Sequence, residues 1–253
     1  ETGLYLVDDR QQARKQLQIV LDKNPSSTMA MFLLGVMEEE AGSTAAAIRY
    51  YREALRLEPD HAGARFFLAN SYYRLGQYDK AIAEYKTSIK MDPENMAVYL
   101  LNAGALLQGG RSRKEILAVI ETATQHFSEQ PLPGYLQIQL LACNDEPVCN
   151  AAQALKLARE IHEQQPIPPH RELLALALAA AGQFDAAIEL QEALVSEAGQ
   201  MMPAMVERLN SVLSDYQSST LPAAEHLFTW QLLQAPPVHG IGAFRDYPTA
   251  KPY

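Results

Sequence analysis

The sequence predicts an all-α protein whose helical hairpins stack into an α-solenoid, an open and curved ribbon of repeats. Three observations support this prediction: residue types recur with a period of 34, apolar residues within a period are spaced by three and four, and Gly and Pro mark fixed places. Of the 253 residues, 48% are apolar and 20% are charged, as in globular proteins. No run of about 18 apolar residues occurs, so we expect no membrane insertion.

The net charge limits the classes of partner. The chain carries 21 basic and 30 acidic residues, which gives a net charge of −9. A surface with an acidic excess does not neutralise phosphate groups. We therefore expect neither nucleic acid nor an anionic membrane as a partner.

The first twelve residues precede the periodic part. Residues 1–3, Glu-Thr-Gly, have the form of a remnant left by expression vectors for secretion, and we interpret 1–12 as this remnant plus a lead-in or partial repeat. Leu4–Asp9 is then a short first helix, or earlier repeats are missing. The segment from Ala13 to Pro25 supplies a second helix.

Five columns of residues recur with the 34-residue spacing. They are Ala13, Ala47 and Ala81; Leu17, Tyr51 and Tyr85; Pro25, Pro59 and Pro93; Gly35, Ala69 and Ala103; and Gly42, Gly76 and Gly110. A small residue such as Gly35 or Ala47 lets two helices cross closely. Gly42 and Gly76 are expected to end a helix in the left-handed conformation, and each Pro is expected to end the following helix.

This pattern resembles the tetratricopeptide-repeat family, in its bacterial form, over residues 13–198. The resemblance implies a right-handed superhelix of about five to six helical hairpins. Residues 131–134, Pro-Leu-Pro-Gly, interrupt the register. The repeats that we assign are Thr28–His61, Ala62–Asn95, a third that begins at Met96 and decays after Gly110, Tyr135–Pro168, and a fifth around Gly182.

The C-terminal part is expected to close the stack. Within residues 199–234, the amphipathic segment from Met205 to Tyr216 predicts a capping helix, and Leu221–Leu233 is a candidate for one more. Residues 235–253 contain four Pro and two Gly, too many for a helix. We interpret them as a tail: a flexible extension, the edge of a further domain, or an extended strap that docks Phe244 and Tyr247 on the solenoid.

Cys143 and Cys149 are the only cysteines, and the turn-forming residues Asn-Asp-Glu-Pro lie between them. Three interpretations stay open: a disulfide that pins a turn between helices, two buried thiols at packing positions, or a metal or redox site. A disulfide indicates an oxidising compartment. Together with residues 1–3, it favours the bacterial periplasm or the cell exterior; free thiols would leave the cytoplasm as the alternative.

No set of side chains points to catalysis or to a bound cofactor or metal. The six histidines form no pair four residues apart and no zinc motif, and no nucleophile, base and orienting group stand together. We interpret residues 38–40, Glu-Glu-Glu, as a solvated helix face rather than as acid–base groups. We therefore expect no enzyme activity, no cofactor and no metal.

The resemblance implies that the first helix of each repeat lines a concave groove, where family members bind segments of other proteins. Carried over position by position, the lining residues are Met29, Phe32, Val36, Phe66, Asn70, Tyr73, Arg74, Leu100 and Leu107. Asn70 matches a residue type that bonds a peptide backbone in chaperone-binding members. An exposed apolar strip marks an interface, and alternatively such side chains pack between neighbouring repeats. The strip that we expect consists of Phe32, Phe66, Tyr73 and Leu100.

These expectations describe a non-catalytic scaffold whose apolar and aromatic groove holds a segment of another protein or a peptide. The alternative is a regulatory or substrate-presenting domain of a larger enzyme or complex at the cell envelope. We expect a monomer or a weak homo-oligomer.

Overall fold

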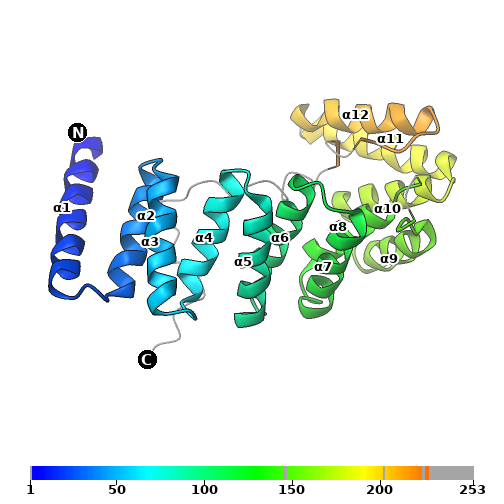
Figure 1. Ribbon diagram of the computed structural model, residues 1–253. Helices are drawn as coiled ribbons and strands as arrows, with labels where there is room; N and C mark the ends of the chain where they lie inside the picture. The colour runs from blue at the N-terminus through cyan, green and yellow to red at the C-terminus, as the bar shows by residue number, and fades with distance from the viewer. Residues whose placement is uncertain (1, 145–146, 202, 224–225, 228–253) are drawn as a thin grey trace. The chain divides into compact units, whose positions relative to one another are not determined.

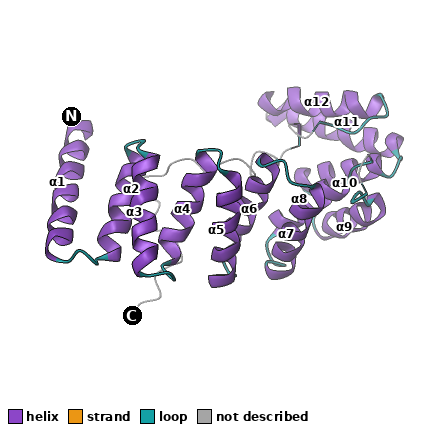
Figure 2. Cartoon of the chain, in the orientation of Figure 1, coloured by secondary structure: helices purple, strands orange, loops and turns teal. Residues whose placement is uncertain are grey.

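A computed structural model describes residues 2–144, 147–201, 203–223 and 226–227 (Figure 1). These residues form α-helices and connecting turns, and no strand occurs among them (Figure 2), so the all-α prediction is confirmed. The helices are α1 (Thr2–Lys23), α2 (Thr28–Glu40), α3 (Thr44–Leu57), α4 (Ala62–Arg74), α5 (Tyr78–Met91), α6 (Met96–Gln108), α7 (Arg113–His126), α8 (Pro131–Leu141), α9 (Ala151–Gln164), α10 (Pro168–Ala180), α11 (Phe184–Met201) and α12 (Pro203–Gln217).

The helices belong to two compact units. Unit 1 contains α1 to α6, and unit 2 contains α7 to α12, with the division between Gly110 and Arg111. The sequence period decays at the same place, because Glu115 stands where earlier repeats have a small residue and Phe127 stands where they have Pro. Loss of the repeat pattern and division of the chain therefore coincide.

Turns between paired helices use glycine as predicted. Gly42, Gly76, Gly110 and Gly182 all have positive φ, between 66° and 76°. After α2 the amide of Ser43 donates to the Glu38 carbonyl at 2.8 Å, which satisfies one of the last free carbonyls of the helix. A residue with a Cβ atom would be strained in this conformation, so glycine is required by the turn itself.

Small residues stand where paired helices cross, as the period predicted. Ala47 and Ala81 are fully buried. A Cβ atom added to Gly35 would lie 2.7 Å from Cδ1 of Tyr51, too close for any side chain. The ring of Tyr51 therefore occupies the space that a larger residue at position 35 would need.

Several predicted boundaries differ from the structure. The segment Leu4–Asp9 is not a separate helix, because good helix formers continue through residues 10–12 and α1 runs unbroken. Pro131 begins α8 instead of interrupting the register, since the first helical position needs no amide hydrogen. The proposed limits 12/13 and 198/199 fall inside α1 and α11.

The C-terminal predictions are met in part. Met205–Tyr216 lies within α12, which confirms a helix there. Residues 221–223 are not helical, because the residue before Pro222 is driven out of helical space. Residues 228–253, which include the predicted tail with Phe244 and Tyr247, lie outside the described part of the chain.

Two equivalent tyrosines differ in how their hydroxyl groups are satisfied. Tyr51 on α3 and Tyr85 on α5 are both fully buried. The Tyr85 hydroxyl donates to Oδ1 of Asn70 at 2.6 Å. The Tyr51 hydroxyl has no partner among the described residues, because Val36 stands one period before Asn70. Burial, followed by the charge of Glu40, raises the pKa of Tyr51.

This difference predicts opposite results for two matched substitutions. Tyr51→Phe is expected to leave the free energy of unfolding unchanged or to raise it, because the lost hydroxyl made no hydrogen bond. Tyr85→Phe is expected to lower it by about 1–3 kcal/mol, because the amide oxygen of Asn70 stays buried without its donor. Urea denaturation followed by circular dichroism measures both changes, and equal losses for the two variants would contradict this account.

Candidate functional site

The predicted groove residues of unit 1 lie on α2, α4 and α6, but most of them are buried. Phe32 is 2% exposed and Val36 is 1% exposed, and the side chains of Phe66, Tyr73 and Leu100 are also buried. The expectation of an exposed apolar strip is therefore wrong. The alternative, that such side chains pack between neighbouring repeats, holds for Phe32, whose ring packs against Phe67 of the next repeat; for the other side chains it stays a prediction.

An aromatic cluster explains the burial of Phe32. Its ring lies 4.9 Å from that of His61 and 5.7 Å, edge to face, from that of Phe67. A Cβ atom on Gly63 would stand 3.2 Å from the Phe32 ring, so glycine there makes room for the aromatic side chain. Tyr51 completes the cluster at 6.1 Å. Such edge-to-face contacts stabilise the packing of α2 on α4.

Asn70 and Tyr73 are engaged inside unit 1. The amide oxygen of Asn70 accepts from the Tyr85 hydroxyl at 2.6 Å, and a bond from Asn70 to a peptide backbone stays a prediction. The ring of Tyr73 stands edge to face on Tyr78 at 5.6 Å. Burial, followed by the neighbouring Tyr78, raises the pKa of Tyr73 to about 12. Both side chains stabilise the repeat stack itself.

Three of the predicted lining residues keep some exposure. Met29 is 57% exposed, and Arg74 and Leu107 are half-buried. Contact of these residues with a partner stays a prediction.

The acidic triplet on α2 is not a solvated face, contrary to the sequence interpretation. Glu39 accepts hydrogen bonds from the Ser71 hydroxyl and from Arg74, both on α4. Its neighbours pair with α1: Glu38 with Arg14 at 2.5 Å, and Glu40 with Arg10 at 3.5 Å. Because helices on both sides supply arginines, α2 is tied to each of them. Burial lowers the pKa of Arg74.

We predict a large loss of stability when the charge of Glu39 is removed from its ion pair with Arg74. In Glu39→Gln, the guanidinium of Arg74 stays half-buried without its carboxylate, so we expect the free energy of unfolding to fall by about 3 kcal/mol. Glu53→Gln is the matched control, because its ion pair with Arg56 lies on the surface of α3. The control should unfold like the wild type in the same urea titration, and an equal effect of both substitutions would contradict the assignment.

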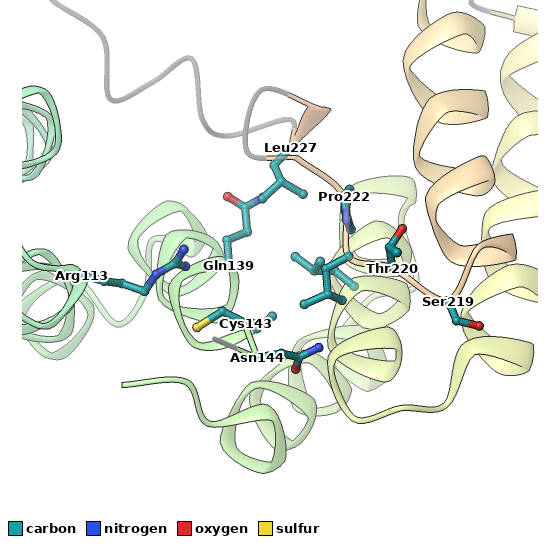
Figure 3. Close-up of a pocket in the computed structure, with 11 residues that line it drawn as sticks. Arg113, Gln139, Cys143, Asn144, Ser219, Thr220, Pro222 and Leu227 are labelled. Atoms are coloured by element: carbon teal, nitrogen blue, oxygen red, sulfur yellow. The ribbon is translucent and has the colours of Figure 1, made fainter. Parts of the chain in front are cut away.

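Unit 2 contains a cavity that the sequence did not predict. Its volume is about 450 Å³, and it lies between α8, α10 and the chain after α12 (Figure 3). Gln139 contributes a buried amide, and Leu176 an apolar wall. The lining residues are Arg113, Gln139, Ala142, Cys143, Asn144, Leu176, Ser219, Thr220, Leu221, Pro222 and Leu227.

A charged pair lines a second, small hollow, which shares Gln139, Leu176 and Leu227 with this cavity. Arg208 of α12 forms a two-pronged contact with Glu172 of α10, at 3.0 and 2.6 Å, and also donates to the carbonyl of His226 at 3.0 Å. The partners Glu172 and Arg208 are 36 residues apart, and Glu39 and Arg74 are 35 residues apart. A search for acidic and basic residues separated by about one period would have found both pairs.

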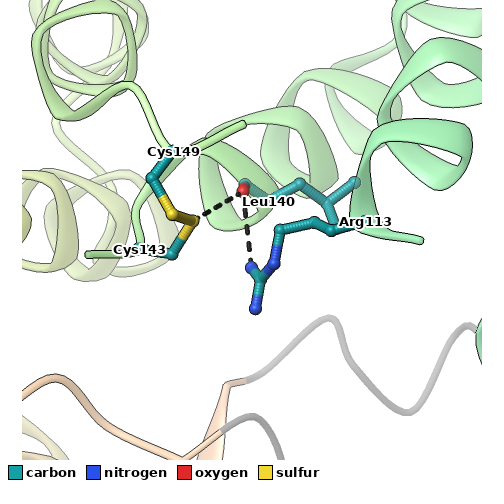
Figure 4. Close-up of a disulfide and its surroundings, with 4 residues drawn as sticks. All are labelled: Arg113, Leu140, Cys143 and Cys149. Atoms are coloured by element: carbon teal, nitrogen blue, oxygen red, sulfur yellow. Dashed lines mark hydrogen bonds between the residues drawn. A yellow bond between two sulfur atoms is a disulfide. The ribbon is translucent and has the colours of Figure 1, made fainter. Parts of the chain in front are cut away.

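The structure pairs Cys143 with Cys149 as a disulfide in the turn between α8 and α9 (Figure 4). The two Cα atoms are 5.0 Å apart, a normal separation for a bonded pair. Sγ of Cys143 lies 3.5 Å from the carbonyl oxygen of Leu140, which also accepts from Arg113 at 3.4 Å. Since Cys143 and Asn144 line the cavity, the turn forms one of its walls.

Two of the histidines, His61 and His170, have structural partners. His61 caps α4, since its Nδ1 accepts from the Ala64 amide at 3.2 Å. His170 is buried between the hydroxyl of Tyr135 and the carbonyl of Gln165, the latter at 2.5 Å from Nδ1. Among the described residues, no group of three or more His, Cys, Asp or Glu could hold a metal ion. In the same part of the chain, every helix is too short or too polar to cross a membrane.

Comparison with protein families gives one family. Models of the tetratricopeptide repeat match residues 7–62, 66–131 and 39–90. A DnaJ homolog subfamily C member 7 homolog of Schizosaccharomyces pombe is 29% identical over 117 residues, 40% of this chain and 25% of that protein. The BBSome complex member bbs-4 of Caenorhabditis elegans is 32% identical over 82 residues, 32% of this chain and 17% of that protein. The chain thus spans a quarter or less of these relatives.

Solved structures of tetratricopeptide-repeat proteins have a similar fold. A tetratricopeptide repeat protein from Parabacteroides merdae has a TM-score of 0.61 at 15% identity, covering 81% of this chain and 84% of that one. YrrB, described as a TPR protein with an unusual peptide-binding site, has a TM-score of 0.58 at 16% identity, covering 74% and 94%. At these identities the likeness concerns the fold alone.

Proposed function

The chain belongs to the tetratricopeptide-repeat family, and on that premise we propose that it is a non-catalytic scaffold that binds a segment of another protein in the cavity of unit 2. The observation that carries this proposal is the mixed lining of the 450 Å³ cavity, in which five residues are polar and six are apolar. Ala142 and Leu176 supply apolar surface, and Gln139 and Asn144 place amide side chains in the lining. This combination suits an extended peptide, whose backbone needs hydrogen bonds and whose side chains need apolar contacts.

Unit 1 contributes a smaller surface to this proposal. Met29, Arg74 and Leu107 are the predicted lining residues that keep exposure, and we assign them to the same kind of partner. The C. elegans relative is by name a member of a multi-protein complex, which agrees with a scaffold role.

A second candidate function is a regulatory or substrate-presenting domain of a larger enzyme or complex at the cell envelope. It is favoured by the length of the curated relatives, in which the matching region is 25% and 17% of the protein. Both candidates place partner binding on the repeats, and they differ in whether the partner is part of the same polypeptide or a separate one.

Site-specific photo-crosslinking tests the scaffold function. A photoreactive amino acid at Asn144, which is exposed and lines the cavity, is expected to capture a partner in native extract. The matched position is Glu160, which is exposed on α9 and lies outside the cavity lining. With the captured protein in purified form, Asn144→Arg should weaken binding at least about tenfold, a loss of about 1.4 kcal/mol. Equal capture at both positions, or an unchanged affinity, would contradict the proposal.

We further propose that Cys143 and Cys149 form a disulfide in the native protein, which then acts in an oxidising compartment, the bacterial periplasm or the cell exterior. Reduction is expected to add two hydrogen atoms to the intact mass. Because the loop is short, the double variant Cys143→Ala, Cys149→Ala should lose about 2 kcal/mol of unfolding free energy. In reductant the variant and the wild type should unfold alike. An unchanged mass on reduction would exclude the bond and favour the cytoplasm.

A further inference from the structure

The chain after α12 turns back onto the inner layer of unit 2, which consists of α8, α10 and α12. We call residues 219–223 and 226–227 the return segment. Helix α12 ends in a turn in which Ser219 has a φ of +55° and the Thr220 amide donates to the Asp215 carbonyl at 2.9 Å. The return segment then lines the 450 Å³ cavity together with α8 and α10 (Figure 3).

The return segment is held as a bound peptide would be held. Its backbone forms a hydrogen bond with α12, because Arg208 donates to the His226 carbonyl at 3.0 Å. Glu172 orients the guanidinium of Arg208, so that Arg208 has a fixed N–H donor for the carbonyl of an extended peptide. The His226 ring adds a contact of 3.3 Å between Nδ1 and the Ser211 hydroxyl.

Apolar side chains of the return segment complete the contact. Pro222 is buried, and Leu221 and Leu227 are half-buried. Leu227 touches two hollows, the large cavity and a small one bounded by Leu173 and Leu176 of α10. A half-buried leucine contributes less free energy of burial than a core leucine. We therefore expect that less free energy is needed to detach this segment than to detach a helix.

We propose that the return segment is an intramolecular ligand of the inner layer of unit 2, and that a partner's extended segment with spaced leucines displaces it. This inference rests on the proposed function, because it concerns the same cavity. It adds the chemistry of the partner, a leucine- and proline-bearing extended stretch whose carbonyl accepts from Arg208. It also adds a regulatory consequence: binding in trans competes with a tethered competitor.

A labelled peptide tests the competition. The probe is a fluorescein-labelled synthetic peptide with the sequence of residues 219–228, titrated into the full chain. The release variant Leu221→Ser, Leu227→Ser alters only the tethered copy and is expected to bind the probe at least about tenfold more tightly than the wild type. Ala223→Ser is the matched control, because Ala223 is exposed in the same segment; it should bind like the wild type. Equal affinities, or no binding to the release variant, would overturn the inference.

Two further measurements keep the result independent of folding. In the release background, Arg208→Lys keeps the charge beside Glu172 but loses the fork of donors, and it should weaken probe binding about tenfold. In the wild type, a saturating concentration of the same peptide, made from isotope-labelled amino acids so that its fragments can be told apart, should raise hydrogen exchange at the chain's own Thr220 amide, which is bonded to the Asp215 carbonyl. Unchanged hydrogen exchange at saturation would overturn the inference. So would a wild type that is a dimer and a release variant that is a monomer, because the return segment would then bind a second copy of the chain.

These outcomes can be separated from those for the scaffold function. If the partner captured at Asn144 binds the wild type and the release variant equally, the scaffold function stands and the intramolecular ligand fails. If the peptide competes as expected but Asn144 captures no partner, the intramolecular ligand stands and the scaffold function fails.

Discussion

Polar pairs between equivalent helices of successive repeats are the contacts on which the stack depends. The pairs are Glu39 with Arg74, Tyr135 with His170, and Glu172 with Arg208. Their partners are 35 or 36 residues apart, so each pair joins neighbouring repeats. Apolar burial supplies most of the stabilisation but is non-directional and tolerates a shifted helix. A shift by one turn would leave these polar groups buried without partners, which is costly, so the pairs set the register.

The size of the side chains on the first helices decides whether the space between these helices is filled or left as a cavity. In unit 1 the large rings of Phe32, Phe67 and Tyr73 fill the space between first helices, and little apolar surface is left for a partner. In unit 2 the equivalent space is bordered by Ala142 and Leu176, which are too small to fill it, and a cavity remains. The two units therefore differ in how completely side chains fill the space between their first helices.

The 34-residue period was sufficient to predict the helices of unit 1, because turn glycines such as Gly42 and crossing residues such as Ala47 depend on local geometry. The period also identified α2, α4 and α6 as the first helices of their repeats. It did not predict whether a side chain there is exposed, as Phe32 illustrates, because burial depends on rings supplied by the next repeat. The cavity of unit 2 was missed because the chain reversal at Ser219 depends on tertiary contacts that leave no periodic trace.

Ser219 shows what holds the return segment in place. Four other helix ends reach positive φ with glycine, whereas this end does so with serine, at a cost of about 1–2 kcal/mol for a residue with a Cβ atom. The turn must therefore be held from outside, by the Thr220 amide on Asp215 and by Arg208 on the His226 carbonyl. Part of this support is the contact between Arg208 and the return segment. When the return segment leaves the inner layer, that support is lost, and we expect Ser219 to leave its strained backbone conformation. The fold thus places a strained turn close in sequence to the contact between Arg208 and the return segment.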